Sequence, residues 1–240
     1  MPDVRIFLSL LLALFLASPA AAQKRRAIGP IPQTVVVNDD FRTGSTSGWE
    51  SGFCDYSPVH EESIERMAGF RPGLGFLLSS HNRSDDIFMF LTKRLTMADG
   101  VRPNQPYEVS FRIELASQAG SGCSGIGGAP GESVFLKAGA WHTRPEVMLA
   151  EDGHYRLTVD KGNQSTDGPA ASVAGNIANG SSLCSDDAPF VTIERTHRHP
   201  YIVQSNALAE IWLLVGTDSG FEGKTTLYYQ VIQATLTPAP

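Results

Sequence analysis

The chain has 240 residues, of which 42% are hydrophobic and 18% charged, and its formal net charge is −6. The normal apolar content with few charges excludes a disordered chain, and three cysteines are too few for a small disulfide-stapled scaffold. The acidic balance argues against nucleic acid as a partner, because phosphate backbones attract basic surfaces.

Residues 1–22 have the pattern of a secretory signal peptide. Arg5 precedes the apolar run 6–17, and three alanines follow at 20–22. We therefore expect cleavage after Ala22 and a secreted or periplasmic mature chain. The run is shorter than the roughly 20 residues of a membrane span. An uncleaved signal anchor is the alternative, and no transmembrane segment is expected after cleavage.

The mature chain is expected to begin with a flexible segment, residues 23–33, which is basic at its start and contains Pro30 and Pro32. Residues 34–240 are expected to form a single domain, because a chain of this length can bury its own core.

Short β-type segments recur through this domain. The clearest is 107–115, where apolar residues alternate with polar ones, which predicts a strand with one wet face. Other strands are expected at 34–37, 74–78, 87–91, 133–138, 155–159, 191–196, 211–215 and 226–236. In the last of these Gln230 interrupts the alternation, which indicates a bulge or burial of both faces.

Many short strands, Gly-rich turns and little helix indicate an all-β fold. We expect a two-sheet antiparallel β-sandwich that is jelly-roll-like, with a closed barrel as the alternative. The loops 117–131 and 161–189 are unusually long, and the first is rich in glycine. Long loops in a compact domain are often functional.

The cysteines allow at most one intramolecular disulfide. Cys123 and Cys184 both lie in loops that can meet at the rim of a sandwich, so we expect a disulfide between them. Cys54 would then be a free, half-buried thiol. Three reduced structural cysteines are the alternative.

Several segments carry a resemblance to known proteins. Residues 39–49 and 225–231 resemble the first and last strands of secreted jelly-roll modules, including carbohydrate-binding ones. Residues 84–90, 121–134, 160–165 and 215–223 are similar to a family of uncharacterised bacterial secreted proteins. This resemblance implies a bacterial envelope or secreted protein and implies no known activity.

Acidic residues near strand ends suggest a metal. Asp218 and Glu222, with nearby carbonyls, could hold a structural Ca²⁺, which prefers hard oxygen ligands. Asp residues are also common in turns because they bond to their own backbone.

No catalytic residue is assigned, since the glycine-rich segment 125–131 lacks the Lys-Ser or Lys-Thr of a nucleotide loop and Gly-x-Ser-x-Gly is absent.

Sugar recognition needs exposed aromatic faces beside hydrogen-bonding groups. Trp141 is the best exposed candidate, whereas Trp212 lies in an apolar run and is expected in the core. Two polar segments, residues 79–86 and 161–164, are expected to supply hydrogen bonds through His81, Asn82, Asp85, Asp86, Lys161 and Asn163.

The leading hypothesis is a monomeric, non-catalytic ligand-binding module outside the cytoplasm, with glycan as its ligand class. One alternative is a secreted glycosidase-like hydrolase that uses loop carboxylates such as Glu132 and Asp218. Another is a structural or interaction protein that contacts an envelope component.

Overall fold

A computed structural model describes residues 33–83 and 86–240, and residues Pro32–Pro240 form one compact unit. The expected signal peptide at 1–22, nearly all of the segment 23–33 and Asp85 lie outside the described residues.

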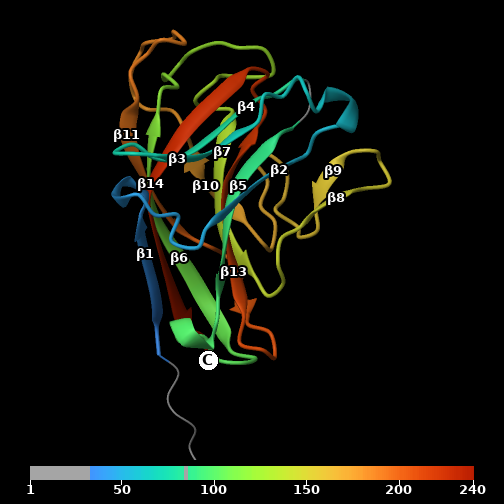
Figure 1. The fold of residues 1–240 in the computed structure, drawn as a ribbon, viewed down its shortest axis with the longest axis vertical. Coiled ribbons are helices and arrows are strands. Elements are labelled where there is room, and N and C mark those ends of the chain that lie inside the picture. Colours follow the sequence, from blue (N-terminus) through green and yellow to red (C-terminus); the bar gives the residue numbers. More distant parts are fainter. Residues whose placement is uncertain (1–32, 84–85) are drawn as a thin grey trace, which may run out of the picture. The chain divides into compact units, whose positions relative to one another are not determined.

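The described residues form two antiparallel sheets that pack face to face as a β-sandwich, with a small separate hairpin (Figure 1). The first sheet has the order β11-β6-β14-β4-β3. In addition, β1 pairs with β14, and β12 pairs with β6. Its strands are β1 (Val35–Asp40), β3 (Met67–Arg71), β4 (Gly75–His81), β6 (Pro106–Ser117), β11 (Val191–Arg198), β12 (Val203–Gln204) and β14 (Lys224–Pro238).

The second sheet has the order β10-β7-β13-β5-β2. Its strands are β2 (Glu50–Cys54), β5 (Phe88–Leu95), β7 (Val134–Trp141), β10 (Ser172–Asn176) and β13 (Ile211–Ser219). The hairpin consists of β8 (Val147–Leu149) and β9 (Tyr155–Leu157). Several consecutive strands, such as β4 and β5, lie in different sheets, as in a jelly roll. The predicted two-sheet sandwich is confirmed.

Helix is confined to three 3₁₀ turns in the described residues: η1 (Phe41–Thr43), η2 (Pro58–His60) and η3 (Met97–Asp99). Thr96 and Asp99 form a capping box that starts η3. None of the helical segments described is long and apolar enough to cross a membrane.

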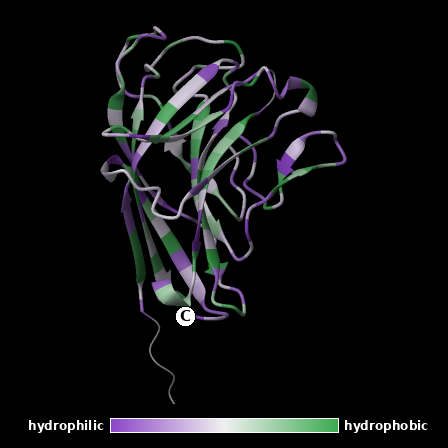
Figure 2. Ribbon diagram, in the orientation of Figure 1, coloured by the Kyte–Doolittle hydropathy of each residue, from purple (hydrophilic) through white to green (hydrophobic). Residues whose placement is uncertain are grey.

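The core lies between the sheets because each long strand turns its apolar phase inward. In β6 the buried residues alternate with half-exposed ones up to Leu115, as the sequence predicted. Figure 2 shows the same alternation of hydrophobic and hydrophilic residues along several strands. Phe41, Trp49 and Phe76 pack edge-to-face at one side of this core.

The second sheet is also covered on its outer face. A smaller apolar cluster there contains Phe88, Phe90 and Leu214, which project away from the main core. Val159, Ala170 and Ala171, from the loop that follows β9, pack against them. This loop, residues 158–171, therefore acts as a lid on the outer face and positions the charged groups described below.

The sequence predicted most of the strands and the irregularity in the last one. The pairing of β14 with β6 shifts register between Tyr229 and Val231, so Gln230 is the site of a bulge. The strands β3, β8, β10 and β12 were not predicted. They are short, and β3 and β10 lie at sheet edges and contain glycine, so no apolar alternation marks them.

The predicted disulfide between Cys123 and Cys184 is present and joins the two long loops. Cys54 is a free thiol, and it is fully buried rather than half-buried as expected. A disulfide between loops fits a protein that folds in an oxidising compartment.

Candidate functional site

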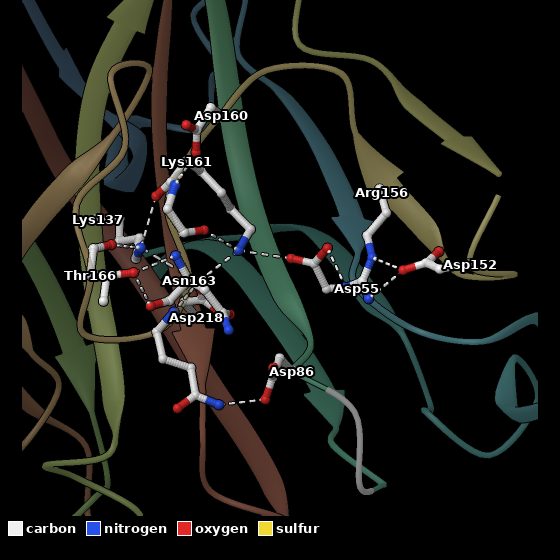
Figure 3. A network of polar contacts seen from close by, with 12 residues as sticks. Asp55, Asp86, Lys137, Asp152, Arg156, Asp160, Lys161, Asn163, Thr166 and Asp218 are labelled. Atoms are coloured by element: carbon white, nitrogen blue, oxygen red, sulfur yellow. Dashed lines mark hydrogen bonds and ion pairs between the residues drawn. The ribbon is translucent and has the colours of Figure 1, made fainter. Parts of the chain in front are cut away.

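A buried charged cluster lies between the second sheet and the loop 158–171 (Figure 3). Asp218 on β13 and Lys137 on β7 have no exposed surface, and Lys161 from the loop is nearly as buried. Lys161 Nζ donates to Asp218 Oδ2 at 2.7 Å, and Lys137 Nζ lies 3.6 Å from the same oxygen. One carboxylate is therefore shared by two lysines in a site without water access.

Strand register brings these side chains together. Gly216 and Asp218 lie on the outward phase of β13, and Lys137 is the cross-strand partner of Gly216. The ring of Phe88 occupies the space beside Gly216, where an added Cβ would lie 2.6 Å from it. The Lys161 ammonium lies 4.9 Å from the centre of the same ring, a cation–π contact.

The loop 158–171 wraps around the end of Lys137. Lys137 Nζ donates to the carbonyls of Lys161 at 2.8 Å and Thr166 at 2.7 Å. Gly162 has a φ of +69°, and a Cβ there would lie 2.1 Å from the Thr166 carbonyl oxygen. Only glycine fits this turn, because both the backbone conformation and the space exclude a side chain.

Alternating charges connect the buried cluster to the surface. Lys161 Nζ lies 2.8 Å from Asp55 Oδ2, and Arg156 donates to Asp55 Oδ1 at 3.0 Å. Arg156 also pairs with Asp152 at 2.9 Å, where both side chains are exposed. Each carboxylate in this series of alternating charges thus has a cationic neighbour, which burial of charge requires.

Burial and neighbours shift the pKa values of these groups in different directions. Burial lowers the pKa of Lys137 and raises the pKa of Asp218. Burial also acts to lower the pKa of Lys161, but the carboxylates of Asp218 and Asp55 outweigh it and raise the pKa above its usual value. Burial raises the pKa of Cys54, which lies beside Asp55. Lys161 is thus the stable cation of the cluster, whereas Lys137 and Asp218 are both driven toward their neutral forms.

The arrangement speaks against the calcium ion expected at Asp218 and Glu222. A dication beside Asp218 would face the Lys161 ammonium and the Lys137 amino group instead of further oxygen ligands. The described residues contain no group of three His, Cys, Asp or Glu side chains arranged to hold a metal. Glu222 lies in another loop, where its N–H donates to the carbonyl of Ile126 at 2.8 Å.

Neighbouring residues of the loop 158–171 also form hydrogen bonds within the protein. Gln164 donates its backbone N–H to Asp218 Oδ2 at 2.9 Å and its side-chain amide to Asp86. Asn163 is exposed, and its N–H bonds to Thr166 Oγ1 at 2.9 Å within the turn. Gln164 thus connects Asp86 to Asp218, whereas Lys161 bonds inside the protein and is closed to a ligand.

A second feature is exposed on the same sheet. Trp141 on β7 and Trp212 on β13 are direct cross-strand partners on its outer face, and both are half-buried. Cβ atoms of such partners lie roughly 5 Å apart, so the two side chains are neighbours on this face, which we call the Trp platform, and Trp141 also packs against the apolar cluster under the loop 158–171. The expectation that Trp212 belongs to the core is wrong, because it alternates with the inward-facing Ile211 and Leu213 and so points outward.

Polar groups surround this Trp platform. The guanidinium groups of Arg144 and Arg94 lie 5.6 Å and 6.0 Å from the centre of the Trp212 ring. Arg144 also pairs with Glu50 at 2.6 Å, and both residues line a neighbouring groove of about 310 Å³. Thr92 and Glu146 line the same groove. The face therefore combines aromatic surface with fixed hydrogen-bonding groups.

His81 and Asn82 lie elsewhere, at the end of β4. His81 lines a pocket of about 540 Å³ together with Lys224 and the disulfide loops, and burial lowers the pKa of its imidazole. Asn82 is buried, and its amide donates to the carbonyls of Ser219 at 3.0 Å and Phe221 at 3.1 Å. The predicted ligand residues are thus divided among three places: the Trp platform, the charged cluster and this pocket.

Sequence analysis missed Lys137, Asp55 and Trp212 as site residues. Lys137 had a recognisable pattern, because it is the one charged residue within the otherwise uncharged segment 133–141. A charge inside a buried strand requires a partner. Nothing in the sequence indicates which acid that partner is.

No protein-family model matches the chain, and no curated protein matches it. Among solved structures, the K1 adhesin domain of Lys-gingipain from Porphyromonas gingivalis is 9% identical, covers 85% of this chain and 99% of its own, and has a TM-score of 0.37. The CBM22-1 xylan-binding domain from Paenibacillus barcinonensis is 14% identical, with 85% and 95% covered and a TM-score of 0.32. These are distant structural similarities, and no family is assigned from them.

Proposed function

We propose that the protein is a non-catalytic module outside the cytoplasm that binds glycan on the Trp platform. The observation that carries this proposal is the pairing of Trp141 and Trp212 on an outward sheet face. Sugar rings present apolar C–H faces that pack on indoles, and their hydroxyls need hydrogen-bond partners at the edge. Arg144 and Glu50 in the adjoining groove supply such partners.

The position of the Trp platform supports binding of an extended ligand. The groove continues from Arg144 toward Val147 at the start of β8, beside the platform. A chain of several sugar units has the length to contact both the indoles and the groove. The Arg and Glu residues named here are paired with one another, so the face has little net charge and suits a neutral glycan.

The hydrolase alternative has less support. Its proposed pair was Glu132 and Asp218, and Asp218 is sealed from solvent with its Oδ2 bonded to Lys161. A glycosidase needs both carboxyl groups open to the substrate.

Secretion is supported by the disulfide between Cys123 and Cys184 and by the leader-like pattern of residues 1–22.

The test is a glycan array probed with the purified mature chain, followed by titration calorimetry on the glycans that bind. We expect Trp212→Ala and Trp141→Ala each to weaken binding at least about tenfold, which is about 1.4 kcal/mol. Phe190→Ala is the matched control, because Phe190 is an exposed aromatic residue that contacts Tyr228 on the other sheet. Chelator is expected to leave the affinity unchanged. Silence on every glycan, or equal affinity of the Trp variants, would refute the proposal.

A further inference from the structure

The surroundings of Lys137 accommodate a neutral amine as well as an ammonium group. Its Nζ has three polar neighbours: the carbonyl oxygens of Lys161 and Thr166 and, at 3.6 Å, Asp218 Oδ2. A neutral amine has two N–H donors and one lone pair. In the neutral form the two close carbonyls take both donors, and the lone pair is free to face the carboxyl group of Asp218, which lies beside Lys137 (Figure 3).

The carboxyl group of Asp218 has one bonded and one unbonded oxygen. Oδ2 accepts from Lys161 Nζ at 2.7 Å and from the Gln164 backbone N–H at 2.9 Å. Oδ1 is buried and has no hydrogen-bond partner within the described part of the chain. Two donors on one oxygen are the arrangement that stabilises an oxyanion in acyl transfer. The other oxygen is then in the position of a leaving group.

The charges of the cluster also balance in this state. If the proton of Lys137 resides on Asp218, the remaining buried ions are Lys161 and Asp55, which pair at 2.8 Å. The downward shift of the Lys137 pKa and the upward shift of the Asp218 pKa favour the same distribution. An unprotonated amine and a protonated carboxyl group are the reactive forms for amide formation.

We propose that Lys137 and Asp218 condense to form an intramolecular amide bond between β7 and β13. The lone pair of Lys137 Nζ attacks Cγ of Asp218, and the negative charge that develops on Oδ2 is stabilised by Lys161 and the Gln164 N–H. The attacking nitrogen gives up a proton to the Oδ1 hydroxyl, the Cγ–Oδ1 bond breaks, and one water leaves. The reaction needs no oxidant, reductant or other reactant.

The fold lowers the barrier by holding the reactants in place. Both groups lie on paired strands of the second sheet, and the loop 158–171 excludes water from them. Fixed orientation in a dry site replaces much of the entropy that a reaction in solution would lose. Lys161 is a catalytic residue of this step, because it touches the oxygen on which charge develops. The inference is independent of glycan binding.

The test is the mass of the folded wild-type chain after reduction and alkylation of its cysteines. We expect this mass to be lower, by the mass of one water, than the mass expected for the reduced and alkylated chain. Trypsin digestion should then yield the peptide 113–156, uncleaved after Lys137, joined to the peptide 199–224. Lys137→Arg keeps hydrogen-bond donors at this position but cannot form this amide, so it should have the full mass expected from its sequence. Lys224→Arg, an exposed control, should lose the water as the wild type does.

Lys161→Gln is expected to slow formation of the joined peptide by roughly 10²-fold, the usual effect of removing one oxyanion donor. A wild-type chain that is folded by circular dichroism and keeps its full mass after prolonged incubation would overturn the proposal. A joined peptide that contains Lys161 instead of Lys137 would overturn it as well. Both results come from the wild-type protein, so they stand even if a variant does not fold.

Discussion

Removal of the disulfide should destabilise the protein by an amount that follows from the loop it closes. Cys123 and Cys184 are separated by 61 residues along the chain. The chain-entropy relation for a loop of this length gives about 14 cal/mol/K, or about 4 kcal/mol at 25 °C. Hydrogen bonds such as Ser121 N–H to the Ser181 carbonyl, at 2.6 Å, keep the loops together in the folded state without the bridge. The loss therefore arises mainly in the unfolded chain.

The assay is urea unfolding of the wild type and of the double variant Cys123→Ser, Cys184→Ser, each followed by fluorescence. With a slope of about 2 kcal/mol/M, the midpoint should fall by about 2 M with little change in slope. Reduction of the wild type should reproduce the shift, and Cys54→Ala, which retains the disulfide, is the control. A shift below about 0.5 M would refute the entropic reasoning.

Three further predictions follow from buried groups. Lys161→Met should lower the free energy of unfolding by about 3–5 kcal/mol in urea titrations, because the buried Asp55 carboxylate and the Asp218 oxygen lose the ammonium group that contacts both; a loss below about 1 kcal/mol would contradict this. Burial lowers the pKa of His199 below 6.5, so the folded protein binds fewer protons than the unfolded chain between the two pKa values, and stability falls as pH drops through this window. His199→Gln should flatten that slope in thermal melts from pH 5 to 7, and an unchanged slope would count against it. The Cys54 thiol is buried and its pKa is raised by burial, so iodoacetamide should label it only after denaturation, and labelling of the native protein would show that this site opens.

The strands that sequence analysis located are those with strong local patterns. Residues 107–115 alternate because β6 lies between two strands with one face in the core and one in solvent. The bulge in β14 was visible because Gln230 breaks that pattern. Edge strands such as β3 and β10 have no such constraint. Both are short and contain glycine, and β10 pairs with β7, which is distant in the chain, so no local pattern marked them.

The candidate site was predicted in its parts and not in its arrangement. Trp141 was identified as an exposed aromatic residue, but its partner Trp212 was assigned to the core, because an apolar neighbourhood does not tell which phase of a strand faces inward. Asp218 was identified as a functional acid, but sequence analysis did not show that two lysines are its neighbours. The sequence shows which residues are charged. Which of these charges pair depends on which loops fold over which strands.

By itself the sequence determined the fold class, the disulfide and the net acidic charge of the chain. These follow from composition, from period-two alternation and from cysteines in loops, all of which act over short stretches. Only the tertiary structure decided that Lys137, Lys161 and Asp218 share one sealed site and that two indoles share one open face. Such contacts join residues up to 81 positions apart in the chain, and they arise from strand register and loop packing, for which short sequence patterns hold no information.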